Sequence, residues 1–270
     1  MPDKSPDQLP DQPATPASRR AWRRPFAMIA AVVAVIAGLV SGGVAISQST
    51  PKHGDSIPNI TLVENQIKAY YGDTVVGTDH LPSPTGNYAK EVEGIAGQAQ
   101  QYLAHQHVKQ AHPALVFDVD DTTLNTYNYE IFSGFAYNPT TNAEYVNDER
   151  FPAVFGMPGL VNWANSHGYT VFFLTGRPEA QRAGTEGNLA KVGYQAPADT
   201  AHLYLKDQTV PWLSFCAPTC TTIQYKSSTR AHIESLGYHI VANFGDQFSD
   251  LEGGHADKTF KIPNPMYYLP

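Results

Sequence analysis

The stretch Ala114-Leu-Val-Phe-Asp-Val-Asp-Asp-Thr-Thr-Leu124 joins an apolar run to three carboxylates, Asp118, Asp120 and Asp121. Residues 114–117 predict a short buried strand, because an uninterrupted apolar run suits a parallel strand covered on both faces. Side chains two positions apart on a strand point the same way, so Asp118 and Asp120 should project together from its carboxyl end. Ligands bind at that end in open α/β sheets. Two adjacent carboxylates repel each other, which favours a divalent cation between them.

The rest of the chain continues the pattern of apolar runs and helices. Four further strands are expected, at residues 169–174, 202–205, 239–244 and 259–262. Helices are expected between them, at residues 159–166, 178–192 and 225–236, and before the first strand, at residues 60–71 and 88–106. Strands that alternate with helices predict an α/β fold with a mostly parallel sheet flanked by helices.

Residues 125–158 interrupt this alternation after the first strand. The segment is dense in aromatic residues, with Asn, Gly and Pro between them, and predicts a loop-rich cap insertion without regular elements. Two interpretations remain open for the aromatic rings. They either form a small satellite core under a long loop or cover the carboxylates and stack on an aromatic or sugar-bearing substrate.

The N-terminal part carries the features of an export signal. Residues 1–24 are rich in Pro, Asp, Gln and Ser and end in an arginine cluster, which predicts a disordered basic tail on the cytoplasmic side. Residues 25–47 are uncharged, and their apolar part has about the length of a membrane-crossing helix, roughly 20 residues. A cleaved signal peptide and a signal anchor both fit this segment. With a linker over 48–58, the domain at 59–270 is expected to be exported, either secreted or anchored by the N-terminal helix.

The charge of the expected exported part limits its partners. Residues 48–270 hold 13 basic and 22 acidic residues, a net charge of −9. An acidic surface argues against nucleic acid or anionic lipid as the main partner. Contact with a membrane is therefore expected only through the N-terminal segment.

The two cysteines, Cys216 and Cys220, lie close together in the sequence. In an oxidising compartment a disulfide is favoured, since a zinc site would need more Cys or His at ligand spacing. A loop this short would contribute about 2 kcal/mol, so the bond would hold a loop rather than the whole fold.

Three later segments place polar groups where strands and helices begin and end. Thr175-Gly176-Arg177 follows the second strand, and Gly245-Asp-Gln-Phe-Ser-Asp250 follows the fourth. Lys226 lies at the start of the helix before that fourth strand. Each segment alone is common, as a helix cap, a turn or a solvated lysine. Their order after the Asp cluster is much more specific.

That order resembles the four motifs of the haloacid dehalogenase (HAD) superfamily, and the chain looks like its subfamily IIIB acid phosphatases. The resemblance extends from about residue 59 to the C-terminus and includes Ala69-Tyr-Tyr-Gly72, Tyr225-Lys-Ser-Ser-Thr-Arg230 and Phe260-Lys-Ile-Pro-Asn-Pro-Met-Tyr-Tyr268. It implies a HAD-like Rossmannoid sheet. Two residues depart from the family pattern: Asp121 stands where many relatives have Glu, and Phe248 where Trp is frequent.

The resemblance also implies the catalytic roles. Asp118 is expected to be the nucleophile that forms an aspartyl-phosphate, and Asp120 the general acid and then the general base. Thr175, Gly176 and Lys226 are expected to bind the transferring phosphoryl group. Such a mechanism is chemically sound, because a carboxylate nucleophile divides a slow hydrolysis into two easier steps.

Magnesium is the cofactor that the resemblance implies. Its expected ligands are the Asp118 carboxylate, the Asp120 backbone carbonyl and the Asp246 side chain. Asp250 is expected to bind the ion directly, to bind it through water, or to orient Lys226. Asp121 is expected to matter least in the first cluster, and the role of Arg177 is left open.

Three functions remain in competition. The leading hypothesis is an exported, Mg²⁺-dependent acid phosphatase that acts on a small-molecule phosphate monoester. A phosphotransferase would use the same aspartyl-phosphate. A non-catalytic storage or binding protein on the same scaffold is the third hypothesis.

Overall fold

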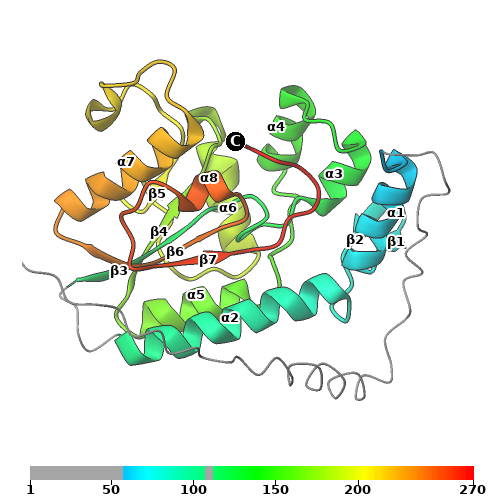
Figure 1. Ribbon diagram of the computed structural model, residues 1–270, viewed down its shortest axis with the longest axis horizontal. Coiled ribbons are helices and arrows are strands. Elements are labelled where there is room, and N and C mark those ends of the chain that lie inside the picture. Colours follow the sequence, from blue (N-terminus) through cyan, green and yellow to red (C-terminus); the bar gives the residue numbers. More distant parts are fainter. Residues whose placement is uncertain (1–56, 107–111) are drawn as a thin grey trace, which may run out of the picture. The chain divides into compact units, whose positions relative to one another are not determined.

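The computed structural model describes residues 57–106 and 112–270, which belong to the compact unit Ser56–Pro270 (Figure 1). The predicted basic tail, the apolar segment at 25–47 and most of the linker lie outside the described residues. Within the two described ranges, none of the helices combines the length and the apolar composition that crossing a membrane requires.

A five-stranded parallel sheet forms the centre of this unit. Its strands lie in the order β5-β4-β3-β6-β7. They comprise β3 (Pro113–Phe117), β4 (Thr170–Leu174), β5 (Leu203–Tyr204), β6 (His239–Gly245) and β7 (Lys258–Lys261). All five predicted strands are therefore present, and no strand end differs by more than one residue from its prediction. The first strand of the sequence, β3, lies in the middle of the sheet, as a run buried on both faces requires.

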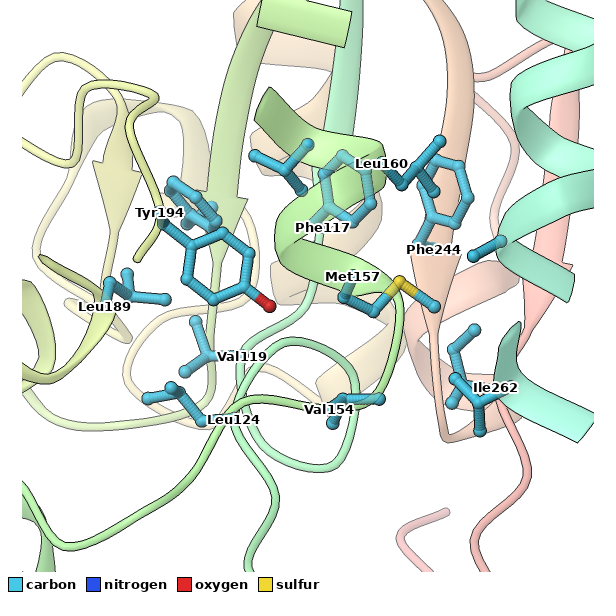
Figure 2. Close-up of a cluster of buried hydrophobic side chains, with 14 of the residues drawn as sticks. Phe117, Val119, Leu124, Val154, Met157, Leu160, Leu189, Tyr194, Phe244 and Ile262 are labelled. Carbon is cyan, nitrogen blue, oxygen red and sulfur yellow. The ribbon is translucent and has the colours of Figure 1, made fainter. Parts of the chain in front are cut away.

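Helices cover both faces of the sheet (Figure 1). α2 (Asn87–Gln106) and α5 (Met157–Ser166) pack on one face, and α7 (Thr222–Ser235) packs on the other. Alternate side chains of β3 divide between the two cores: Leu115 and Phe117 join the α2/α5 side, while Ala114 and Val116 join the α7 side. In Figure 2 the Phe117 and Phe244 rings of β3 and β6 stack, with centroids 4.2 Å apart.

The remaining elements surround this central unit. α1 (Ile60–Tyr71) has the predicted bounds and is followed by an antiparallel hairpin of β1 (Thr74–Val76) and β2 (Asp79–Leu81), which was not predicted. After β4 come a 3-10 turn, η1 (Glu179–Gln181), and α6 (Arg182–Lys191). A second 3-10 turn, η2 (Pro211–Leu213), precedes α7, and the short α8 (Phe248–Leu251) follows β6.

The cap insertion differs from its prediction, because it contains two short helices. These are α3 (Tyr127–Ser133) and α4 (Pro139–Asn147). α3 ends at Gly134 in the left-handed conformation, and α4 begins at Asn138, whose side chain accepts from two backbone amides. Three of the residues that suggested a loop, Gly134, Asn138 and Pro139, lie at the ends of these helices.

Most aromatic residues of the cap belong to the main core rather than to a separate satellite core. Tyr127, Tyr129, Tyr145 and Phe151 are buried in the main core, whereas Phe132 is 63% and Tyr137 69% exposed. Most of the rings therefore pack in the core, and two remain at the surface of the cap.

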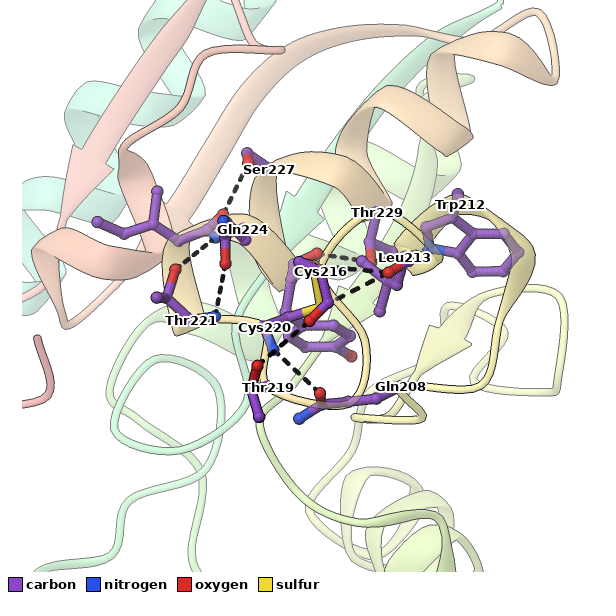
Figure 3. Close-up of a disulfide and its surroundings, with 12 residues drawn as sticks. Gln208, Trp212, Leu213, Cys216, Thr219, Cys220, Thr221, Gln224, Ser227 and Thr229 are labelled. Atoms are coloured by element: carbon purple, nitrogen blue, oxygen red, sulfur yellow. Dashed lines mark hydrogen bonds between the residues drawn. A yellow bond between two sulfur atoms is a disulfide. The ribbon is translucent and has the colours of Figure 1, made fainter.

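The two cysteines are bonded in the loop before α7 (Figure 3), with an S–S distance of 2.01 Å. Cys220 N–H donates to the Gln208 side chain at 3.1 Å, and Thr221, the next residue, caps α7 through a reciprocal pair with Gln224. The disulfide therefore holds the chain directly before the helix that carries Lys226.

Candidate active site

Three carboxylates from two neighbouring strand ends converge at the carboxyl edge of the sheet. Asp118 follows β3, and Asp246 and Asp250 follow β6; one oxygen from each lies within 4.8 Å of the other two. All three residues are at most 6% exposed. Gly245 makes this approach possible, because a Cβ there would overlap the Asp250 side chain. We refer to Asp118, Asp246 and Asp250 as the three-carboxylate cluster.

Lys226 is the cation of this cluster. Its Nζ donates to Asp118 Oδ1 at 2.5 Å and lies 3.1 Å from Asp250 Oδ1. A third contact, to the Leu174 carbonyl oxygen at 2.6 Å, directs the ammonium toward the end of β4. Burial alone would lower the pKa of Lys226, but the charges of Asp118 and Asp250 outweigh it and raise the pKa. Lys226 therefore keeps its proton.

The charge of the cluster is incompletely balanced by Lys226. Burial raises the pKa of Asp118, and although the charge of Lys226 lowers it, the charges of Asp250 and Asp246 raise it further. The pKa of Asp246 is raised to about 8, mainly by burial and further by the negative charges of Asp250 and Asp121. Among the described residues, Lys226 is the single cation within ion-pair distance of the cluster. When all three carboxylates are ionised, they and the one ammonium carry a net charge of two negative units, which a bound divalent cation would balance.

Asp120 does not belong to the three-carboxylate cluster; its carboxylate forms an ion pair with Arg177. The Arg177 guanidinium donates to both carboxylate oxygens, with Nη2 to Oδ1 at 2.6 Å and Nε to Oδ2 at 3.0 Å. Arg177 also donates to Thr185 at 2.9 Å and places its guanidinium carbon 5.4 Å from the Phe151 ring centroid. Such a two-pronged contact holds the carboxylate in one orientation. The residue whose role the sequence left open thus positions Asp120, which keeps 29% of its side chain exposed.

Thr175 ends β4 beside these groups. Its backbone amide donates to Tyr204 at 2.9 Å, and its hydroxyl oxygen accepts from the Arg177 amide at 3.2 Å. Gly176, between them, is exposed, so its backbone is open to a ligand. The structure therefore brings the ends of β3, β4 and β6 and the start of α7 together at one edge of the sheet.

A comparison with known protein families covers all of these residues. Residues 43–270 match the model of the HAD superfamily, subfamily IIIB (acid phosphatase). The chain belongs to this family. The resemblance inferred from the motifs is thereby confirmed, and so is the fold class, since the solved structure of the class C acid phosphatase from Bacillus anthracis matches with a TM-score of 0.56. That structure is 23% identical and covers 77% of this chain and 86% of its own.

Two curated plant proteins show how the family varies. The stem 28 kDa glycoprotein of Glycine max is 36% identical over 189 residues, covering 67% of this chain and 70% of the relative. Acid phosphatase 1 of Solanum lycopersicum is 31% identical over 192 residues, covering 67% and 69%. Only the second name states an activity, so the activity of this subfamily IIIB member has to be argued from its residues.

Asp121 has a larger part in the site than its sequence position suggested. It is fully buried, and its backbone is in the left-handed conformation, with φ of 54°. Thr126 donates to it from its amide at 3.0 Å and from its hydroxyl at 2.5 Å, and Tyr267 donates at 2.8 Å. Burial raises the pKa of Asp121 to about 7, although the Thr126 hydrogen bonds oppose this rise. Asp121 ties the start of α3 and the C-terminal segment to the end of β3.

Three further residues of the subfamily IIIB site were missed as site residues. Gln247 and Asn264 both donate to Asp246 Oδ2 at 2.7 Å, and Thr122 lies 3.4 Å from Asp246 Oδ1. These contacts orient the Asp246 carboxylate. Asn264 belongs to the Phe260–Tyr268 segment that resembles the family, which was the available signal for its role.

Proposed function

We propose that this protein is an exported, Mg²⁺-dependent acid phosphatase that hydrolyses small-molecule phosphate monoesters through an aspartyl-phosphate on Asp118. The observation that carries the proposal is the buried contact of Asp118 with Lys226 beside Asp246 and Asp250. A carboxylate can approach an anionic phosphate only where nearby positive charge offsets their repulsion. Family membership supports the same reaction class.

The chemistry follows from Asp118 and Asp120, the two aspartates directly after β3. A carboxylate oxygen of Asp118 attacks phosphorus in line, and the bond from phosphorus to the ester oxygen breaks. Asp120, held by Arg177, gives its proton to the departing alcohol oxygen. Asp120 then takes a proton from water, whose oxygen attacks the same phosphorus and releases inorganic phosphate and the Asp118 carboxylate.

Two groups hold the phosphoryl oxygens in this scheme. The ammonium of Lys226 neutralises charge, and Thr175 with the backbone of Gly176 offers hydrogen bonds at the end of β4. A Mg²⁺ ion bound by Asp118, Asp246, the Asp120 carbonyl and, directly or through water, Asp250 would supply further positive charge. The incomplete charge balance of the three-carboxylate cluster supports such an ion.

The test is the substitution Asp118→Asn in the full-length protein, assayed with p-nitrophenyl phosphate at acidic pH in the presence of Mg²⁺. Turnover should be lost, because a carboxamide is not a nucleophile toward phosphorus. Asp148→Asn, at an exposed aspartate of the cap, is the matched control and should retain activity. Turnover by Asp118→Asn at the unmodified rate would refute the assignment.

The alternatives give different results in the same assay. A phosphotransferase would form a new phosphate ester when an acceptor alcohol is added, which product analysis detects. A storage or binding protein would show no turnover before any substitution. Export is tested separately, by fusing residues 1–58 to a reporter enzyme that is active only outside the cytoplasm.

A further inference from the structure

The two carboxylate oxygens of Asp246 are held very differently. Oδ2 accepts from the side-chain amides of Gln247 and Asn264, each at 2.7 Å. In the part of the chain that the structure describes, the one hydrogen-bond contact of Oδ1 is the Thr122 hydroxyl, at the longer distance of 3.4 Å. An oxygen that accepts from two close N–H donors has both of its lone pairs in use. Oδ1 is therefore the oxygen that Asp246 offers to a metal ion.

The orientation of both amides is set by the backbone after β7. The side-chain oxygen of Asn264 accepts from the Met266 amide at 2.9 Å, which turns its nitrogen toward Asp246. The side-chain oxygen of Gln247 accepts from the Leu269 amide at 3.0 Å, with the same result. Each amide thus presents a donor to Asp246, and exchanging its oxygen and nitrogen would break two hydrogen bonds.

The other two carboxylates of the three-carboxylate cluster are also engaged. Asp118 Oδ1 accepts from Lys226 at 2.5 Å. Asp250 Oδ2 accepts from the Gln247 backbone amide at 3.0 Å, and its Oδ1 lies 3.1 Å from Lys226 Nζ. Every carboxylate of the cluster therefore has at least one oxygen on a protein donor. A cation that keeps these contacts receives at most one oxygen from each carboxylate.

Divalent cations differ in how many carboxylate oxygens they take. Mg²⁺ demands an octahedral shell of about six oxygens and retains several waters, so single carboxylate oxygens suit it. Ca²⁺ takes roughly six to eight oxygens and often both oxygens of one carboxylate. To bind Asp246 in that way, Ca²⁺ would have to displace two amide donors from Oδ2. Donors left without an acceptor in a buried site are costly.

We propose that Gln247 and Asn264 are positioning residues that restrict Asp246 to binding through one oxygen and so make the three-carboxylate cluster select Mg²⁺ over Ca²⁺. This inference rests on the metal site of the proposed function and names the residues that exclude the larger cation. Loss of a hydrogen bond that orients a metal ligand lowers metal affinity by about 10–100-fold. Here the loss falls on Mg²⁺, because the freed Oδ2 becomes a further ligand for Ca²⁺.

The test is calorimetric titration of the metal-free, full-length protein with MgCl₂ and, separately, with CaCl₂ at one pH. The unmodified protein should bind Mg²⁺ at least as tightly as Ca²⁺. Asn264→Leu keeps nearly the same side-chain size but removes the donor. In this variant the ratio of Mg²⁺ affinity to Ca²⁺ affinity should fall about tenfold.

Two further variants complete the design. Asn147→Leu makes the same exchange at an exposed position of the cap and should leave the ratio unchanged. In Asn264→Ser the hydroxyl can still accept from the Met266 amide and keep the local turn, but it is too short to reach Asp246. This variant should lower the ratio as Asn264→Leu does. Because both metals are titrated into one preparation, the ratio does not depend on how much of a variant is folded.

The possible outcomes separate this inference from the proposed function. A ratio that falls less than twofold in the Asn264 variants overturns the selective role of the amides. An equal loss of affinity for both cations also overturns it, since that indicates structural support alone. Tighter binding of Ca²⁺ than of Mg²⁺ by the unmodified protein has the same consequence. Absence of Mg²⁺ binding by the unmodified protein refutes the metal site of the proposed function itself.

Discussion

The substitution Glu130→Gln should raise the stability of the protein at alkaline pH. Glu130 lies in the first turn of α3 and is 7% exposed. Glutamine has nearly the same shape as glutamate but carries no charge, so it removes the cost of partly withdrawing this carboxylate from water. Burial, with a smaller contribution from the Asp120 charge, raises the pKa of Glu130 from 4.5 to about 7. The ionised form is therefore disfavoured in the folded protein relative to the unfolded chain.

The sign and size of the effect follow from this difference in pKa. The folded protein holds the proton up to about pH 7, whereas the unfolded chain loses it near pH 4.5. The contribution of Glu130 to stability is thus complete below pH 4.5 and is lost as the pH rises through about 7. The loss amounts to at most roughly 3 kcal/mol. For a domain of this size that corresponds to about 6–12 °C in Tm.

The assay is thermal unfolding of the metal-free protein at pH 4 and at pH 8. Glu130→Gln should unfold at a higher temperature than the unmodified protein at pH 8, with little difference at pH 4. Glu144→Gln, at an exposed site, should match the unmodified protein at both. An equal or lower Tm of Glu130→Gln at pH 8 would show that Glu130 has a partner or lies in water. A gain of the same size at both pH values would show that charge is not its cause.

Three further predictions follow from the site and the disulfide. Lys226→Met should lower kcat/KM for p-nitrophenyl phosphate by about a thousandfold or more, since Asp118 and Asp250 lose their cation; a loss below tenfold would contradict the charge role. Mg²⁺ should raise Tm more at pH 8 than at pH 5, because protons compete for the three-carboxylate cluster; equal rises would contradict the metal site. Replacing Cys216 and Cys220 with Ser should cost about 2 kcal/mol, or ~4–8 °C in Tm, with kcat retained; loss of the folded state would show that the disulfide holds more than a loop.

The parallel sheet was predictable because its strands are buried on both faces. Residues 114–117 and 171–174 are buried on both faces of the sheet, so their sequences are continuous apolar runs. The edge strand β5 is shorter than its apolar run, since it pairs with β4 over two residues. The hairpin of β1 and β2 was missed, because three-residue strands with exposed or half-exposed side chains have no apolar period.

The cap could not be read as helical for a related reason. α3 spans seven residues and α4 nine, too short for an apolar period to stand out from their caps. Their aromatic residues pack against distant parts of the chain, as in the stack of Tyr127 on Tyr71. A contact between residues so far apart in sequence leaves no local pattern.

The candidate site also contains features that the sequence predicts and features that only the folded chain reveals. The positions of Asp118, Thr175 and Asp246 were predictable, because each follows an apolar strand and parallel strands present their carboxyl ends at one edge. The pairing of Asp120 with Arg177 was not, since 57 residues separate them and both side chains had several possible partners. The hydrogen bond of Tyr267 to Asp121 crosses 146 residues.

By itself, then, the sequence determined which chemical groups stand at the strand ends and in what order, since strand burial leaves a continuous apolar signal. The tertiary structure alone decided how the charges are compensated: Asp118 by Lys226, Asp120 by Arg177, and Glu130 by no described residue. The physical reason is that the free energy of a buried charge depends on the groups within a few ångströms of it, and chain folding brings those groups from distant segments.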